Sequence, residues 1–363
     1  MNPTLRDQFF GCIAGVHIGS AMAAPVEGWP WQRIQAEYGT LQQFLPYHHY
    51  RATTDWVREP GTTEDGVERQ KLIITALMRK GDRITAEDLR AVWVSDMNPN
   101  GAGVVSEPFE GPLLAMAKTP IPARDLGRYC DYAGLVSFAR SCHPIGLINA
   151  GDVHGALQDI LEVGQVYQTS NSRGLQWAAV TGVAIAAATK PDATVESVLG
   201  AVLHVCGTFK ERFVQDAHVV RELERGLELT AHCQDFQELR AAFDQVYQGK
   251  GIPYAAAYAN EVVTKGVCIF KLVNGNLHDA IVAGVNMGRD TDCTSAVAAG
   301  ISGALSGSAG LPEEWVRQCD RATHLNPYTN SQRTLREHAD GLYDAFQARL
   351  QKMRRYVETM NVD

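Results

Sequence analysis

The chain has 363 residues, of which 45% are hydrophobic and 20% are charged, and its formal net charge is −8 at pH 7. No Lys/Arg run reaches the density of a nucleic-acid-binding face. Asp7, Gln8 and His17 interrupt the first apolar segment, and no run approaches the length of a membrane span, which argues against a signal peptide and a transmembrane helix. We therefore expect a cytoplasmic globular protein without nucleic-acid or membrane partners.

The eight cysteines are scattered along the chain, and none of them forms a CxxC pair. This spacing argues against a zinc finger and against a disulfide framework. Most of the cysteines lie in apolar runs, so we expect small buried thiols in a reducing compartment.

Helical periodicity begins with the first segment, in which apolar residues recur from Leu5 to Val16. A strip of glycines lies beside this apolar face, at Gly11, Gly15 and Gly19. Because glycine has no side chain, this strip predicts that a second helix packs closely against the first.

Three further helices are predicted in the middle of the chain. One should begin near Thr63-Glu64, whose side chains can accept from free backbone N–H groups. The segment from Trp177 to Thr189 is almost wholly apolar, which predicts a helix buried on all sides. Thr194 is placed as the N-cap of the helix that follows.

The last third of the chain carries two more helical patterns. A small-residue strip after Asp292 predicts tight packing at the centre of the fold, through Ala296, Gly300, Ala304 and Gly307. Residues 331–358 form an amphipathic helix that we expect to dock on the surface through Leu335, Ala339, Leu342, Phe346, Leu350, Met353 and Val357.

Strand-like alternation is scarce, and no linker divides the chain. We therefore predict an all-α fold of roughly a dozen helices, formed by residues 1–363 as a single domain.

The most informative motif is the segment Asp290-Thr291-Asp292-Cys293-Thr294. Two carboxylates two residues apart, among hydroxyls and at the start of a helix, suit a hard cation such as Mg²⁺. Alone, such a pair is more often an N-cap beside a surface acid.

A second acidic segment strengthens the metal interpretation, because Thr62-Thr63-Glu64-Asp65 repeats the same chemistry far upstream. Acids in a first helical turn are also favoured by the helix dipole, which is the simpler explanation for Glu64 and Asp65 alone. Two distant acidic turns, each opening an apolar helix, are what a metal-centred hydrolase requires.

In chain order, the segments "GCIAGVHIGSAMAAPVEGW", "TTEDGVERQ", "HPIGL" and "VNMGRDTDCTSAVAAGISGALSG" resemble the ADP-ribosylglycohydrolase, or DraG-like, family over about residues 5–315. The resemblance implies an all-α hydrolase with one or two Mg²⁺ or Mn²⁺ ions. It also implies cleavage of the N- or O-glycosidic bond of an ADP-ribosylated protein or a related ribosyl small molecule.

The resemblance also implies roles for individual residues. Its metal ligands would be Thr63, Glu64, Asp65, Asp290, Asp292 and, as a hydroxyl near Cys293, Thr294. Glu27 matches a glutamate that acts as acid or base in some members, and Asp65 would join it in catalysis. Asn286 and Gly288 match the family segment that shapes the turn before the second acidic segment. From side-chain chemistry alone, Arg128 is a candidate to pair with a phosphate or carboxylate of the substrate, and Tyr129 a candidate to stack on a base or ring.

The sequence departs from the family pattern at several positions. Ser20 stands where an aspartate is usual, Glu64 where a shorter aspartate is usual, and Cys293 where a hydroxyl is usual. The Gly/Ser-rich pyrophosphate loop is not evident before Pro144, where the chain reads Gly127-Arg128-Tyr129. Three alternatives therefore stay open. The protein is a nucleoside-type ribosyl hydrolase of small metabolites, a phosphohydrolase, or a non-catalytic descendant of the fold that acts as a binding or structural protein.

Overall fold

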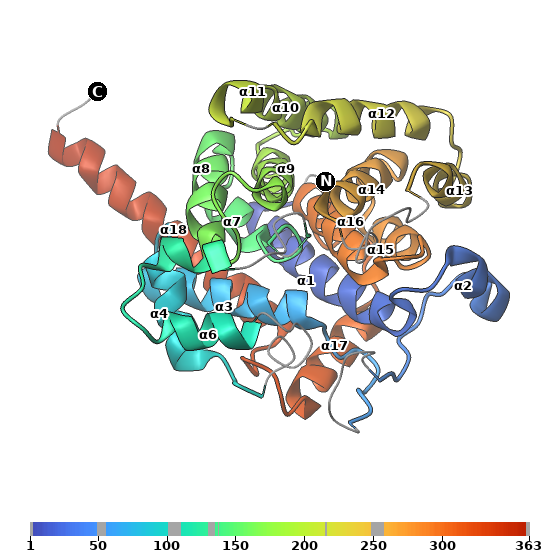
Figure 1. The fold of residues 1–363 in the computed structure, drawn as a ribbon, viewed down its shortest axis with the longest axis horizontal. Coiled ribbons are helices and arrows are strands. Elements are labelled where there is room, and N and C mark those ends of the chain that lie inside the picture. Colours follow the sequence, from blue (N-terminus) through green and yellow to red (C-terminus); the bar gives the residue numbers. More distant parts are fainter. Residues whose placement is uncertain are drawn as a thin grey trace.

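The computed structural model describes residues 3–48, 56–100, 110–129, 135–136, 138–214, 216–247 and 258–360. Within these ranges there are seventeen α-helices, three 3-10 helices and two isolated β-bridges, and no strand occurs (Figure 1). The predicted all-α class is confirmed.

The α-helices are α1 Leu5–Ala23, α2 Trp31–Tyr38, α3 Asp65–Lys80, α4 Ala86–Asp96, α6 Glu110–Ala117, α7 His143–Ile148, α8 Val153–Val163, α9 Arg173–Ala188, α10 Val195–Gly207, α11 Phe209–Arg212, α12 Val219–Ala231, α13 Phe236–Tyr247, α14 Ala259–Leu272, α15 Leu277–Val285, α16 Thr291–Ser306, α17 Glu313–Leu325 and α18 Leu335–Met360. The 3-10 helices are η1 Ala24–Val26, η2 Ala123–Tyr129 and η3 Gly164–Val166.

Helices α1 and α16 pack side by side at the centre of the molecule and form its most extensive helix pair (Figure 1). An added Cβ on Gly11 would lie 2.4 Å from the carbonyl carbon of Gly307, and one on Gly15 would lie 2.8 Å from the carbonyl oxygen of Ala299. The backbones therefore touch, as the glycine strip predicted. The predicted strip on α16 is partly confirmed. Gly307 meets Gly11, and Gly300 packs against both Val16 of α1 and His143, but the α16 residues that meet Gly15 and Gly19 are Ala299 and Ser295.

The interior helix predicted over Trp177–Thr189 is confirmed as part of α9, which is buried along nearly its whole length. Thr194 is the N-cap of α10 and forms a capping box with Ser197, also as predicted. Helix α3 begins at Asp65 rather than at Thr63. Glu64 is its N-cap residue, but the Glu64 side chain makes no capping hydrogen bond.

The C-terminal helix α18 docks over only part of its length. Its buried residues run from Leu335 to Arg349, whereas every residue from 351 to 360 is exposed. In Figure 1 this last part projects away from the body of the protein. The expectation that Met353 and Val357 belong to the docked face is therefore wrong, since they are 52% and 48% exposed.

One described segment, Leu5–Val26, is long and apolar enough on average to cross a membrane, although polar residues interrupt it. Its most apolar stretch is 94% buried inside the protein, as it is in a core helix of a globular fold. Seven cysteines are described and all are free; six are buried, Cys233 is partly exposed, and Cys130 lies outside the described residues.

Candidate metal centre

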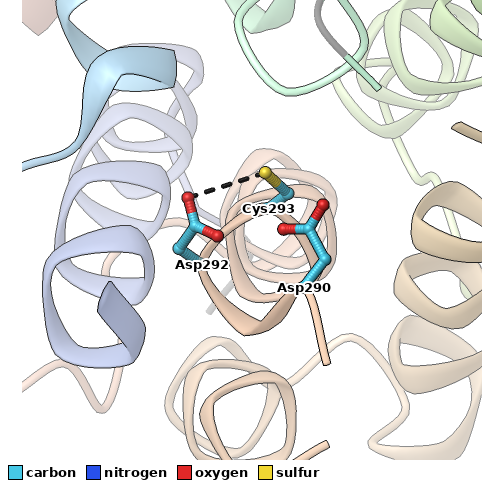
Figure 2. Close-up of side chains that lie close together, drawn as sticks. All are labelled: Asp290, Asp292 and Cys293. Carbon is cyan, nitrogen blue, oxygen red and sulfur yellow. Dashed lines mark hydrogen bonds between the residues drawn. The ribbon is translucent and has the colours of Figure 1, made fainter. Parts of the chain in front are cut away.

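Two carboxylates and a thiol lie together at the N-terminus of α16. Asp290 precedes the helix and makes no capping hydrogen bond with its side chain, while Asp292 and Cys293 lie in the first turn. Their ligand atoms are all within 4.8 Å of one another, and all three residues are buried (Figure 2). The hydroxyl of Thr291 donates to the carbonyl oxygen of Ala23 over 3.1 Å, which fixes this turn against the end of α1.

The turn before α16 is paired with the turn that carries Glu27. The amide of Gly28 donates to the carbonyl oxygen of Arg289 over 2.7 Å. In return, the amide of Arg289 donates to the carbonyl oxygen of Trp29 over 2.7 Å. Both Gly28 and Arg289 have positive φ angles, of 79° and 68°. These two backbone bonds bring the partly buried Glu27 into the electrostatic neighbourhood of Asp290.

The upstream acids lie at the N-terminus of α3, where arginines neutralise them. Glu64 accepts hydrogen bonds from the guanidinium of Arg58 and the hydroxyl of Tyr47. Asp65 accepts from Arg69 Nη2 over 2.9 Å and from Arg140 Nη2 over 2.5 Å. These contacts stabilise both carboxylates in their ionised form.

Arg140 connects the two acidic segments and is the residue that the sequence prediction missed. Besides Asp65, its guanidinium reaches α16, where Nη1 lies 3.2 Å from Cys293 Sγ and 4.0 Å from Asp292 Oδ2. It comes from the turn before α7, far from both segments in the chain. A lone arginine in "SFARSCHPIGL" carries no spacing that would distinguish it.

The acids around the start of α16 have shifted pKa values. Burial raises the pKa of Asp290, of Asp292 and of Glu27 above their ordinary values. For Glu27 the repulsion by Asp290 is the next cause, and for Asp292 it is the repulsion by Glu27. A cation among these three carboxylates would relieve the repulsion.

The donor atoms fit a hard divalent ion. In the part of the chain that the structure describes, the Oδ1 atoms of Asp290 and Asp292 are buried and have no hydrogen-bond partner. Buried carboxylate oxygens are costly unless they are paired or bind a metal. Cys293 is a poor ligand for such an ion, because sulfur is a soft donor that hard cations disfavour; burial also raises the pKa of its thiol. Two carboxylate oxygens in this setting suit Mg²⁺ or Mn²⁺.

The remaining predicted ligands lie at the starts of α3 and α16. The hydroxyl of Thr63 donates to Glu68 over 3.4 Å, and the side chain of Glu64 is engaged as described above. Thr294 is buried one turn into α16, where its amide donates to the carbonyl oxygen of Asp290 over 3.1 Å. Among the predicted ligands, Asp290 and Asp292 belong to the described group of acids and thiol whose ligand atoms lie within 4.8 Å of one another.

Asn286 and Gly288, predicted to shape the substrate site, support the turn. The Asn286 side chain accepts from the amide of Leu41 over 2.8 Å and donates to the carbonyl oxygen of the same residue over 2.9 Å. Gly288 has φ of 77°, and a Cβ there would lie 2.6 Å from the backbone nitrogen of Trp31. Both residues therefore build the loop that presents Asp290.

Arg128 and Tyr129, also predicted to bind substrate, are exposed at the end of η2. Arg128 pairs with Asp125 over 3.0 Å, and η2 packs chiefly on η3, α6 and α4. The structure does not bring these two side chains together with Asp290 and Asp292.

The chain belongs to the ADP-ribosylglycohydrolase family, whose model matches residues 1–351. It is 24% identical over 346 residues to the uncharacterized protein YegU of Escherichia coli K12, covering 88% of this chain and 94% of YegU.

Two further similarities agree with this family. A segment of 52 residues, 14% of each chain, is 38% identical to the ADP-ribosylarginine hydrolase Tri1 of Pseudomonas putida GB-1. A solved structure described as an ADP-ribosylglycohydrolase-related protein complex matches the fold with a TM-score of 0.54 and 17% identity, over 94% of this chain and 97% of that one.

Proposed function

We propose that this protein is a Mg²⁺- or Mn²⁺-dependent hydrolase that cleaves the bond between ribose C1 and its substituent in an ADP-ribosyl or related ribosyl compound. The family supports the reaction class, and the similarity to an ADP-ribosylarginine hydrolase supports a ribosyl substrate. The observation that carries the proposal is a pair of buried oxygens, on Asp290 and Asp292, that have no hydrogen-bond partner among the described residues and lie in the electrostatic neighbourhood of Glu27.

Asp290 and Asp292 would hold the ion, because the acids at the start of α3 already have arginine partners. When bound, the ion would act as a Lewis acid that stabilises negative charge on substrate oxygens. The hydrogen bond of Thr291 to Ala23 and the turn at Gly288 hold the segment that carries both aspartates.

Glu27 is the residue suited to proton transfer. Hydrolysis adds the hydroxyl group of water to ribose C1 and a proton to the leaving group, so one group must take the proton that the water gives up. A carboxylate with a raised pKa is a stronger base for that step than one with an ordinary pKa. The pKa of Glu27 is raised by burial and by the neighbouring acids, and its side chain keeps some exposed surface.

The test is a substrate panel assayed by mass spectrometry with Mg²⁺, Mn²⁺ or a chelator. The panel contains a peptide ADP-ribosylated on arginine, one ADP-ribosylated on serine, and a plain ribonucleoside. We expect metal-dependent release of ADP-ribose or ribose from at least one of them, and a loss of more than about 100-fold in kcat for Asp292→Asn.

Asp159→Asn is the matched control, because Asp159 is also a buried aspartate but pairs with Arg83 and Asn149 away from this centre. It should lower stability and leave kcat unchanged. Cleavage of the nucleoside alone would move the assignment to small-metabolite hydrolysis. Release of phosphate alone would indicate a phosphohydrolase, and absence of both cleavage and metal binding would indicate a non-catalytic descendant.

A further inference from the structure

Arg140 is held in the centre by its own turn and by close packing on α3. Its turn is closed by backbone hydrogen bonds from Ser141 and Cys142 to the carbonyl oxygen of Phe138, of 3.1 and 2.9 Å. Its side chain then runs over Gly66, where an added Cβ would lie 2.8 Å from Arg140 Cδ. A residue larger than glycine at position 66 would displace the arginine stem. The guanidinium is thereby fixed in a buried position.

The guanidinium lies between the two acidic segments. It donates to Asp65 at the start of α3, and it also faces Cys293 and Asp292 at the start of α16. A positive charge that touches both segments takes the position in which a cation shared by them would lie. Arginine stays charged at any working pH, so this charge is permanent.

The acids that would hold a second ion are the ones that arginines neutralise. Glu64 is paired with Arg58, and Asp65 with Arg69 and Arg140. Asp290 has no ion pair among the described residues, and its Oδ1 and that of Asp292 remain without hydrogen-bond partners there. The carboxylates of Asp290 and Asp292 at the start of α16 therefore supply the negative charge and the ligand atoms for one ion.

We infer that Arg140 serves as a built-in cation that replaces one of two metal ions, so the centre binds a single divalent ion through Asp290 and Asp292. The inference rests on the proposed metal-dependent function. Arg140 is a positioning residue here: it links Asp65 to α16, and it excludes a second ion by its charge and its volume.

The experiment is Mn²⁺ titration of the full-length protein by calorimetry and by electron paramagnetic resonance, for the wild type, Arg140→Lys and Arg140→Gln. We expect one Mn²⁺ per wild-type chain, with the spectrum of an isolated ion. Arg140→Lys, which keeps the charge, should do the same. Arg140→Gln should take up a second Mn²⁺, and two ions at the ~3.5–4 Å spacing of dinuclear sites would give a spin-coupled spectrum.

Two coupled Mn²⁺ ions in the wild type would overturn the inference and leave the proposed function standing. A single ion in Arg140→Gln would overturn the role of Arg140 in excluding the second. Failure of the wild type to bind Mn²⁺ would overturn the proposed function as well. The wild-type measurement decides the stoichiometry even if the glutamine variant does not fold.

Discussion

The amide of Gly28 donates to the carbonyl oxygen of Arg289 over 2.7 Å, across two turns that are 261 positions apart in the chain. Gly28 has a φ of 79°, a conformation that L side chains adopt only at a cost. Because Glu27 precedes this glycine and Asp290 follows Arg289, the bond fixes a candidate base beside a candidate metal ligand.

The variant Gly28→Ala should therefore lose activity beyond its loss of stability. Among the described residues, no atom lies within 4 Å of an added Cβ at this position, so the change strains the backbone without a clash there. The strain costs about 1–2 kcal/mol and is relieved by moving the Glu27 turn. We expect a kcat at least about 10-fold lower, since small misplacements of reacting groups reduce rates strongly.

Gly39→Ala is the matched control for this prediction. Gly39 also has a positive φ, of 66°, and open space around an added Cβ, but it caps the C-terminus of α2. It should show a similar drop in denaturation midpoint with unchanged kcat. Equal kcat losses in the two variants would show that the Gly28 turn has no special role.

The variant Glu27→Gln should lower activity while it raises the stability of the metal-free protein. The pKa of Glu27 is raised by burial and by Asp290, Glu64 and Asp65, so its negative charge destabilises the folded state. Glutamine removes that charge at nearly the same size. We expect kcat to fall about 10²–10⁴-fold, as for loss of a general base, and the melting temperature in chelator to rise. A variant that keeps wild-type kcat would exclude Glu27 from proton transfer.

Local patterns made the fold predictable. The helical period of apolar residues and the glycines of α1 lie within single segments, so the all-α class and the close approach of a second helix could be read from the sequence. The helix number was underestimated, because short helices such as α7, with six residues, and α11, with four, are too short to show a period. The free end of α18 was missed because its apolar stripe continues past the last docked residue.

The candidate centre was predictable only where its residues are neighbours in the chain. Asp290 and Asp292 are brought together by one helical turn. The pairing of Glu64 with Arg58 depends instead on the bridge that sets Arg58 beside Tyr47, and the contact of Arg140 with Asp65 spans 75 positions. The spacing of residues along the chain does not reveal such contacts. The sequence alone therefore favours a metal role for the acids of α3, although arginines pair with them in the folded protein.

The packing of α1 on α16 leads to a third prediction, for Gly303→Ala. An added Cβ at Gly303 would lie 2.1 Å from the carbonyl oxygen of Gly11. Backbone cannot yield as a flexible side chain can, so the helices must separate. We expect a loss of about 3 kcal/mol or more in the free energy of unfolding, measured by guanidinium denaturation.

Gly200→Ala provides the matched comparison, because Gly200 lies inside α10 and has nothing within 4 Å of an added Cβ. Alanine favours the helix over glycine there, so this variant should gain about 0.5–1 kcal/mol. Equal stabilities for the two alanine variants would contradict the backbone contact between α1 and α16.

The last prediction concerns a group of buried histidines and the glutamine that connects two of them. His17 Nε2 lies 3.1 Å from Gln70 Oε1, and Gln70 Nε2 lies 3.2 Å from His143 Nδ1. The ring of His338 lies 5.7 Å from that of His17, and neither of its nitrogens has a partner among the described residues. Burial lowers the pKa of all three histidines, that of His143 to about 3.

These histidines are neutral in the folded protein, so below their ordinary pKa of 6.5 the unfolded chain binds more protons than the folded one. Stability is therefore complete above pH 6.5 and falls as the pH drops towards 3, by up to about 1.4 kcal/mol per pH unit for each histidine. The check is denaturation between pH 4.5 and 8 in saturating Mn²⁺, which suppresses the opposite trend of the centre's acids.

His338→Leu should reduce this slope by up to about 1.4 kcal/mol per pH unit. It should not lower stability at pH 7, because an apolar side chain replaces a buried imidazole that has no hydrogen-bond partner in the described part of the chain. His154→Leu, at an exposed position on α8, should follow the wild-type curve. If His338→Leu keeps the full acid sensitivity, protonation of His338 does not contribute to acid unfolding, and the loss of stability must arise at His17 and His143.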